Sequence, residues 1–129
     1  MSLEKKILLI LKESLKLNKS KVTSGTKIKI PNSNLLEWDE TDEKFYTIIP
    51  NFNISSNLLL NINKQKLELI RNTKQFCEGL PSNNVLLWGA RGTGKSSLIY
   101  CIFNELIKEY KVTMIEIKNF QIKSLNKIL

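Results

Sequence analysis

The sequence predicts an α/β fold in which helices flank a parallel sheet, and three consecutive segments carry this prediction. Residues 85–88 (VLLW) form an apolar run of strand length, as expected of a strand that is buried on both faces. Apolar side chains then recur at helical spacing from Lys95 to about Tyr110, and residues 111–118 (KVTMIEIK) have the composition of a second strand. A strand, a loop, a helix and a strand in this order form one unit of a parallel sheet.

The loop between the first strand and the helix, residues 89–97, has the sequence GARGTGKSS and fits the pattern G-x-x-x-x-G-K-[ST]. Glycine at positions 89, 92 and 94 permits positive φ, so consecutive backbone N–H groups can turn toward a phosphate. The helix that follows adds the positive end of its dipole. A glycine-rich turn without a ligand is the simpler alternative, but the flanking strand and helix favour a P-loop nucleotide-binding fold.

The motif also predicts the residues of a site for ATP and Mg²⁺. Lys95 supplies a mobile ammonium for the β- and γ-phosphates and is the residue to which we assign a catalytic role. The Ser96 hydroxyl is the predicted metal ligand, because Mg²⁺ keeps several of its waters and takes few protein ligands. The predicted nucleotide-binding residues are Gly89, Ala90, Arg91, Gly92, Thr93, Gly94, Lys95, Ser96 and Ser97.

The length of 129 residues suits one ordinary domain but is short for a whole P-loop NTPase. Doubly wound sheets contain about five or more strands, and few elements fit between the loop and the last residue. We therefore expect a nucleotide-binding domain over residues 58–129 that is incomplete at its C-terminus. A small N-terminal α/β region, residues 1–57, is expected to precede it.

Within the N-terminal region, the apolar pattern predicts one helix and two short strands. Apolar residues between positions 3 and 15 fall on one helical face, residues 28–30 alternate in the manner of a strand, and residues 45–49 (FYTII) form the second strand. An acidic cluster at residues 37–43 surrounds Trp38. Paired carboxylates could serve acid–base or metal chemistry, but adjacent charges between structured elements favour a solvated loop.

A further helix is predicted over residues 63–77, because apolar residues recur there at helical steps and Gly79 and Pro81 follow. The short connection GLPSNN, residues 79–84, then leads into the strand before the P-loop. This order places the helix beside the nucleotide.

Composition excludes several other functions. The net charge is +8, but the cations are mostly lysines scattered along the chain, so a nucleic-acid partner is not supported. The chain has no His, which excludes a zinc site or a Cys/His nucleophile, and Cys77 and Cys101 are expected to be buried free thiols. No apolar run reaches the length of a membrane span and no signal-peptide pattern is present, so we expect a cytoplasmic protein without a membrane partner.

Four segments around the motif form a more specific pattern than the motif itself: INKQ (62–65), RNTKQF (71–76), GLPSNN (79–84) and VLLWGARGTGKSSL (85–98). With them the chain resembles a bacterial family of predicted AAA+ ATPases of otherwise unknown function, roughly over residues 58–118. The resemblance implies an AAA+-like P-loop fold that hydrolyses ATP in its complete form. Assembly into a homo-oligomer follows only by analogy with AAA+ proteins.

The resemblance also suggests a contact with the base. In that family the segment matching residues 61–65 reads Gly-Ile-Asp-Arg-Gln, and its equivalent in AAA+ proteins frames the adenine. Asn61, Asn63 and Lys64 differ from it, so Ile62 alone is carried over as a nucleotide-binding residue. The N-K-x-D signature by which GTPases recognise guanine is missing from the sequence, so adenine is preferred over guanine.

Hydrolysis in AAA+ proteins also needs a Walker B acid, a sensor and an arginine finger, all of which are expected downstream of Leu129. Glu116 lies within the strand after the P-loop helix and Arg91 belongs to the loop itself, so neither replaces them. We expect negligible steady-state ATPase from residues 1–129 alone. A nucleotide-binding or interaction module without turnover is the main alternative, and a P-loop kinase is a third.

Overall fold

The computed structural model describes residues 6–12, 28–49 and 63–128, and for 6–12 and Lys127 it describes the backbone alone. The chain divides into two compact units. Unit 1 joins residues 1–49 to residues 112–129, and unit 2 is residues 50–111. The strand that follows the P-loop helix belongs to unit 1.

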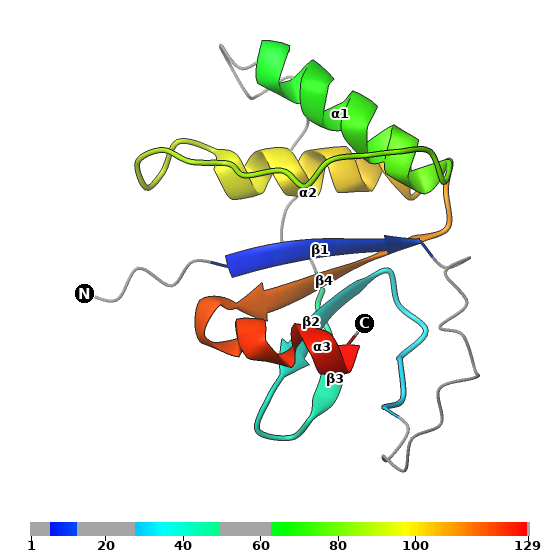
Figure 1. The fold of residues 1–129 in the computed structure, drawn as a ribbon, viewed down its shortest axis with the longest axis vertical. Coiled ribbons are helices and arrows are strands. Elements are labelled where there is room, and N and C mark those ends of the chain that lie inside the picture. Colours follow the sequence, from blue (N-terminus) through cyan, green and yellow to red (C-terminus); the bar gives the residue numbers. More distant parts are fainter. Residues whose placement is uncertain (1–5, 13–27, 50–62, 129) are drawn as a thin grey trace. The chain divides into compact units, whose positions relative to one another are not determined.

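Unit 1 is built on a four-stranded sheet with the order β1-β4-β2-β3 (Figure 1). β1 (Lys6–Lys12) pairs along its whole length with β4 (Val112–Lys118) in antiparallel register. β4 also pairs in parallel with β2 (Leu35–Asp39), which is joined to β3 (Lys44–Thr47) as an antiparallel pair. β4 is therefore the strand that holds the two N-terminal segments in one sheet, and its prediction as a strand is confirmed.

The strand β1 shows that the predicted N-terminal helix is wrong over residues 6–12. The segment KILLILK is a short apolar run, and such a run is compatible with either a helix or a strand. Pairing with β4 provides hydrogen bonds between strands that the local pattern does not encode, and this decides for the strand. The other end of the predicted helix lies outside the described residues.

The acidic cluster is not one solvated loop, because its first half belongs to β2. Side chains alternate across a strand, so Trp38 is buried while its neighbours Glu37 and Asp39 are half-buried on the other face. Residues 40–43 form the turn to β3, where Asp39 Oδ1 accepts the backbone N–H of Thr41 at 2.8 Å. The strand predicted at residues 45–49 is present as β3, but it starts at Lys44 and already ends at Thr47.

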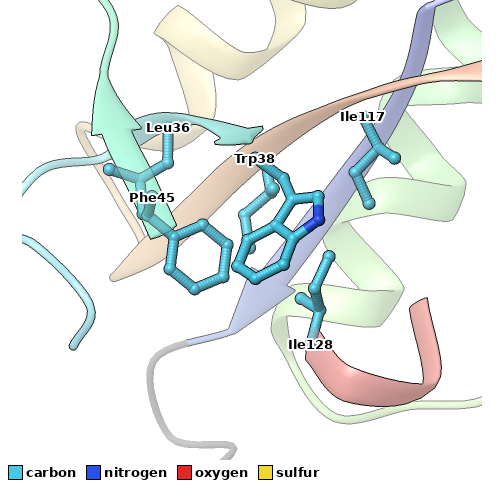
Figure 2. Packing of buried hydrophobic residues seen from close by; sticks show 6 residues of the cluster. Leu36, Trp38, Phe45, Ile117 and Ile128 are labelled. Carbon is cyan, nitrogen blue, oxygen red and sulfur yellow. The ribbon is translucent and has the colours of Figure 1, made fainter. Parts of the chain in front are cut away.

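The core of unit 1 forms where one face of β2 and β4 meets the C-terminal helices. Its centre is Trp38, which is fully buried, with its ring centroid 5.0 Å from that of Phe45. Figure 2 shows the indole between Phe45 and the side chains of Ile117 and Ile128. The 3-10 helix η2 (Asn119–Ser124) and α3 (Leu125–Ile128) follow β4 and bring Ile128 into this core. The buried members of the cluster are Leu36, Trp38, Phe45, Ile115, Ile117 and Ile128.

Unit 2 contains two helices, α1 (Asn63–Cys77) and α2 (Lys95–Leu106), and both predictions are confirmed. α1 ends as its glycine predicts: Gly79 has φ of +75°, and Leu80 N–H donates to the Gln75 carbonyl at 2.9 Å. A left-handed glycine followed by this backbone bond is a common helix stop. The helix α2 is shorter than expected, because residues 107–109 form turns.

Polar contacts join α1 to α2 and to the turn that follows it. Lys66 Nζ lies 3.8 Å from Glu105 Oε1, and Lys74 Nζ lies 3.2 Å from Glu109 Oε2. Both cysteines are buried thiols, as predicted, with Cys77 on α1 and Cys101 on α2. Among the helices of the described ranges, none is both long and apolar enough to cross a bilayer.

The predicted strand before the P-loop is not formed. Residues 85–88 make no strand pairing, and Leu86 and Trp88 are 85% and 87% exposed. An apolar run becomes a strand only when a partner satisfies its backbone groups, and no described segment pairs with this one. Residues 28–30 likewise carry no strand. A parallel P-loop sheet therefore stays a prediction.

The centre of the unit 1 core generates a stability prediction. Within the described part of the chain, Trp38 Nε1 is buried and has no hydrogen-bond partner. We expect Trp38→Ala to lower the free energy of unfolding by about 3–5 kcal/mol, as large core truncations do. Trp38→Phe should cost less than about 1 kcal/mol, because relief of the unpaired N–H offsets the smaller volume. Urea unfolding followed by circular dichroism measures both, and equal losses would contradict the prediction.

A second prediction concerns the contact between Tyr110 and Glu78. The Tyr110 hydroxyl donates to Glu78 Oε1 at 2.8 Å, and this bond, with burial and the charge of Glu78, raises the pKa of Tyr110 to about 12. Because the pKa is raised, the contact stabilises fully below about pH 10 and is lost as the pH rises through 12. Titration of tyrosine absorbance should show one group near pH 12 that moves toward pH 10 in Glu78→Ala. The exposed Glu68→Ala is the control, and a titration unchanged by Glu78→Ala would contradict the assignment.

Candidate functional site

The loop at residues 89–97 takes its shape from three glycines with positive φ. The φ values are +142° at Gly89, +81° at Gly92 and +81° at Gly94. Residues other than glycine adopt positive φ at a cost of about 1–3 kcal/mol each. The glycine spacing therefore selects a backbone path that few other sequences would follow, and this path leads straight into α2.

The loop ends at the N-terminus of α2, which begins at Lys95. Gly94 is the N-cap in the left-handed conformation and offers no side chain to cap the helix. The first bond of the helix runs from the Leu98 N–H to the Gly94 carbonyl at 2.8 Å. The N–H groups of residues 95–97 come before that bond, so they have no carbonyl partner within the helix. They point out of the positive end of a twelve-residue helix.

The Lys95 ammonium is held against the start of the loop. Its Nζ donates to the Gly89 carbonyl at 2.9 Å, to the Ala90 carbonyl and to Thr93 Oγ1 at 3.0 Å. An ammonium has three N–H donors, so each has an acceptor within the loop. The side chain is half-buried while the surrounding loop is exposed. The cation thus lies at the loop surface, where an anion from solvent can reach it.

The Thr93 hydroxyl links the start of the loop to the Lys95 ammonium. It donates to the Ala90 carbonyl at 2.8 Å and accepts from Lys95. A Cβ built on Gly89 would lie 3.5 Å from Thr93 Oγ1 and 3.9 Å from Lys95 Nζ. The start of the loop is therefore in van der Waals range of both side chains.

The structure describes all of the predicted loop residues, 89–97, and they differ in their exposure to solvent. Arg91 and Ser96 are exposed, and Ser97 is half-buried. Ser96 follows Lys95 in the first turn of α2 and is exposed to solvent. Ile62 lies outside the described residues. Asn63 and Lys64, which were compared with the adenine segment, form the first turn of α1.

Asn72 on α1 fixes the chain before the loop, and the sequence did not single it out. Its Nδ2 donates to the Asn83 carbonyl at 2.8 Å, and its Oδ1 accepts the Asn83 N–H at 2.8 Å. The side chain thus satisfies both backbone groups of one residue in the GLPSNN connection. Asparagine has a poor helix propensity, so its presence inside the predicted helix was the one sequence signal that its side chain has a role.

The site chemistry is that of an anion receptor. Lys95 and Arg91 provide two cations, and the helix N-terminus adds unpaired amides. Among the residues that the structure describes, no group of three or more His, Cys, Asp or Glu side chains could hold a metal ion. A divalent cation here would be held by the Ser96 hydroxyl together with water and phosphate oxygens, which suits Mg²⁺.

Comparison with known protein families gives a match over most of the chain. The model of a family described as "Protein of unknown function (DUF815)" matches residues 31–129, which is most of the chain. The match includes the loop, α1, α2 and all of the sheet except β1. No curated protein and no solved structure matches the chain.

The contact between Asn72 and Asn83 generates a prediction at the level of single amides. We expect Asn72→Ala to expose the Asn83 N–H and to lower the free energy of unfolding by about 1–2 kcal/mol, since two hydrogen bonds are lost. Asn72→Asp keeps the acceptor and should keep the Asn83 N–H protected. Amide hydrogen exchange monitored by NMR distinguishes these outcomes. Equal exchange at Asn83 in wild type and Asn72→Ala would show that the contact does not hold the connection.

Proposed function

The chain belongs to the family of proteins of unknown function termed DUF815, and this membership does not indicate a function. We propose from the geometry of the loop that the chain binds Mg·ATP through residues 89–97. The observation that carries the proposal is the position of Lys95. Its ammonium lies over a loop with three positive-φ glycines, at the N-terminus of α2. This combination of a cation, flexible glycines and unpaired amides suits a polyphosphate.

In the proposed complex the loop and the start of the helix bind the phosphates. The amides of residues 95–97 donate to phosphate oxygens, and Lys95 exchanges part of its contact with the loop carbonyls for the β- and γ-phosphates. The Ser96 hydroxyl would help to hold Mg²⁺, which would supply positive charge to the phosphates. Each role falls on a residue that is exposed or half-buried, and none of them is fully buried.

The choice of ATP over other polyphosphates comes from the resemblance to AAA+ ATPases. In that class, the same loop would stabilise the charge that develops on the phosphates during hydrolysis of the β–γ bond. Hydrolysis additionally needs a group that orients the attacking water. We therefore propose nucleotide binding as the function of the described site, and hydrolysis only where such a water-orienting group is also present.

The test is calorimetric titration of the chain with Mg·ATP. We expect wild type to bind and Lys95→Ala to raise the Kd by about 10- to 100-fold, the effect of losing a charge-assisted hydrogen bond. Ser96→Ala should weaken binding in the presence of Mg²⁺ and have little effect in EDTA. Titration with Mg·GTP measures the preference for adenine.

The matched control is Lys108→Ala, which removes an exposed lysine of the same unit. It should leave the Kd for Mg·ATP within about twofold of wild type, because a remote surface charge is screened by salt. Equal affinities of wild type and Lys95→Ala would remove Lys95 from the site. Equal losses in the two lysine variants would reduce the proposal to nonspecific attraction of an anion.

A further inference from the structure

Thr93 forms a closed ring of hydrogen bonds with Lys95 and the Ala90 carbonyl. Lys95 Nζ donates to Thr93 Oγ1 at 3.0 Å, Thr93 Oγ1 donates to the Ala90 carbonyl at 2.8 Å, and Lys95 also donates to that carbonyl. A hydroxyl has one proton to donate. Thr93 donates this proton to the Ala90 carbonyl, so its oxygen can accept a hydrogen bond from the ammonium. Every donor in the ring therefore faces an acceptor.

The ring explains why the ammonium lies over the loop instead of extending into water. A lysine side chain has four flexible carbons, and confining it costs conformational entropy. The two carbonyls and the hydroxyl together supply acceptors for all three N–H groups. Gly89 suits this position through its backbone, because its φ of +142° is a conformation that residues with a side chain rarely adopt.

We infer that Thr93 is a positioning residue that acts through Lys95. Its hydroxyl holds the ammonium over the loop before a ligand arrives, so part of the ordering cost has been met when a polyphosphate binds. The effect on ATP affinity rests on the proposed function. The effect on the position of Lys95 does not, because it concerns the chain without nucleotide.

The first arm of the test measures Lys95 itself, in the full chain without nucleotide. An amine attacks an acylating reagent only after its ammonium leaves its acceptors and loses a proton, so fewer acceptors give faster acetylation. We expect Thr93→Val to speed acetylation of Lys95 by about threefold or more, as expected for loss of one charge-assisted bond. Thr93→Ser should restore the wild-type rate. Mass spectrometry reads the rate at Lys95 relative to the exposed Lys108.

The second arm measures the Kd of the same variants for Mg·ATP. Thr93→Val should raise it by about 3- to 10-fold, with Thr93→Ser within about twofold of wild type. The matched control is Thr47→Val, which changes an exposed threonine of β3. It should change neither the acetylation rate nor the Kd. Valine has the shape of threonine, so the loop glycines keep their conformations in the test variant.

The outcomes separate this inference from the proposed function. Unchanged acetylation of Lys95 in Thr93→Val, or failure of serine to restore it, overturns the role of Thr93. Faster acetylation with an unchanged Kd overturns the link between the position of Lys95 and phosphate binding. If wild type does not bind Mg·ATP while the acetylation pattern holds, the proposed function fails and Thr93 remains the residue that positions Lys95.

Discussion

The candidate site depends on one constraint, which is that the Lys95 ammonium must find acceptors without leaving the surface of the loop. Three acceptors from Gly89, Ala90 and Thr93 meet this need. They converge because positive φ at the glycines turns the backbone carbonyls of the loop toward the lysine. The geometry of the loop and the position of the cation are therefore parts of the same arrangement, and a change in either would alter the other.

The loop belongs to unit 2, and unit 1 is organised around a core of its own. Unit 2 carries the loop together with α1, and Asn72 fastens the connection that enters it. Unit 1 has its own core around Trp38, and its sheet depends on β4. β4, an interior strand of the unit 1 sheet, is the next element in the chain after α2.

Local features were predicted well where one segment contains all the information. The bounds of α1 match its helical period, and the Gly79 stop has the predicted left-handed conformation. α2 begins at Lys95 because Gly94 ends the loop there. The positions of the loop glycines likewise come directly from the motif.

Features that depend on distant partners were not predictable from local pattern. β1 was expected to be a helix, and only pairing with β4, more than ninety residues away in the chain, makes it a strand. Trp38 was placed in a solvated loop because charged neighbours surround it, yet alternation across β2 buries it. Residues 85–88 show the reverse case, since a good strand sequence without a described partner forms no strand. The contact of Asn72 with Asn83 could not be predicted either, because it depends on how α1 lies against the connection that follows it.

The central claim is that residues 89–97 bind the phosphates of ATP, and backbone amide NMR tests it most directly. Titration of the ¹⁵N-labelled chain with Mg·ATP reports on every loop amide at once. The account predicts saturable shifts that are largest at Gly92, Gly94, Lys95 and Ser96 and small in unit 1. Shifts that are absent from the loop, or that are spread evenly over exposed lysines of both units, would contradict it.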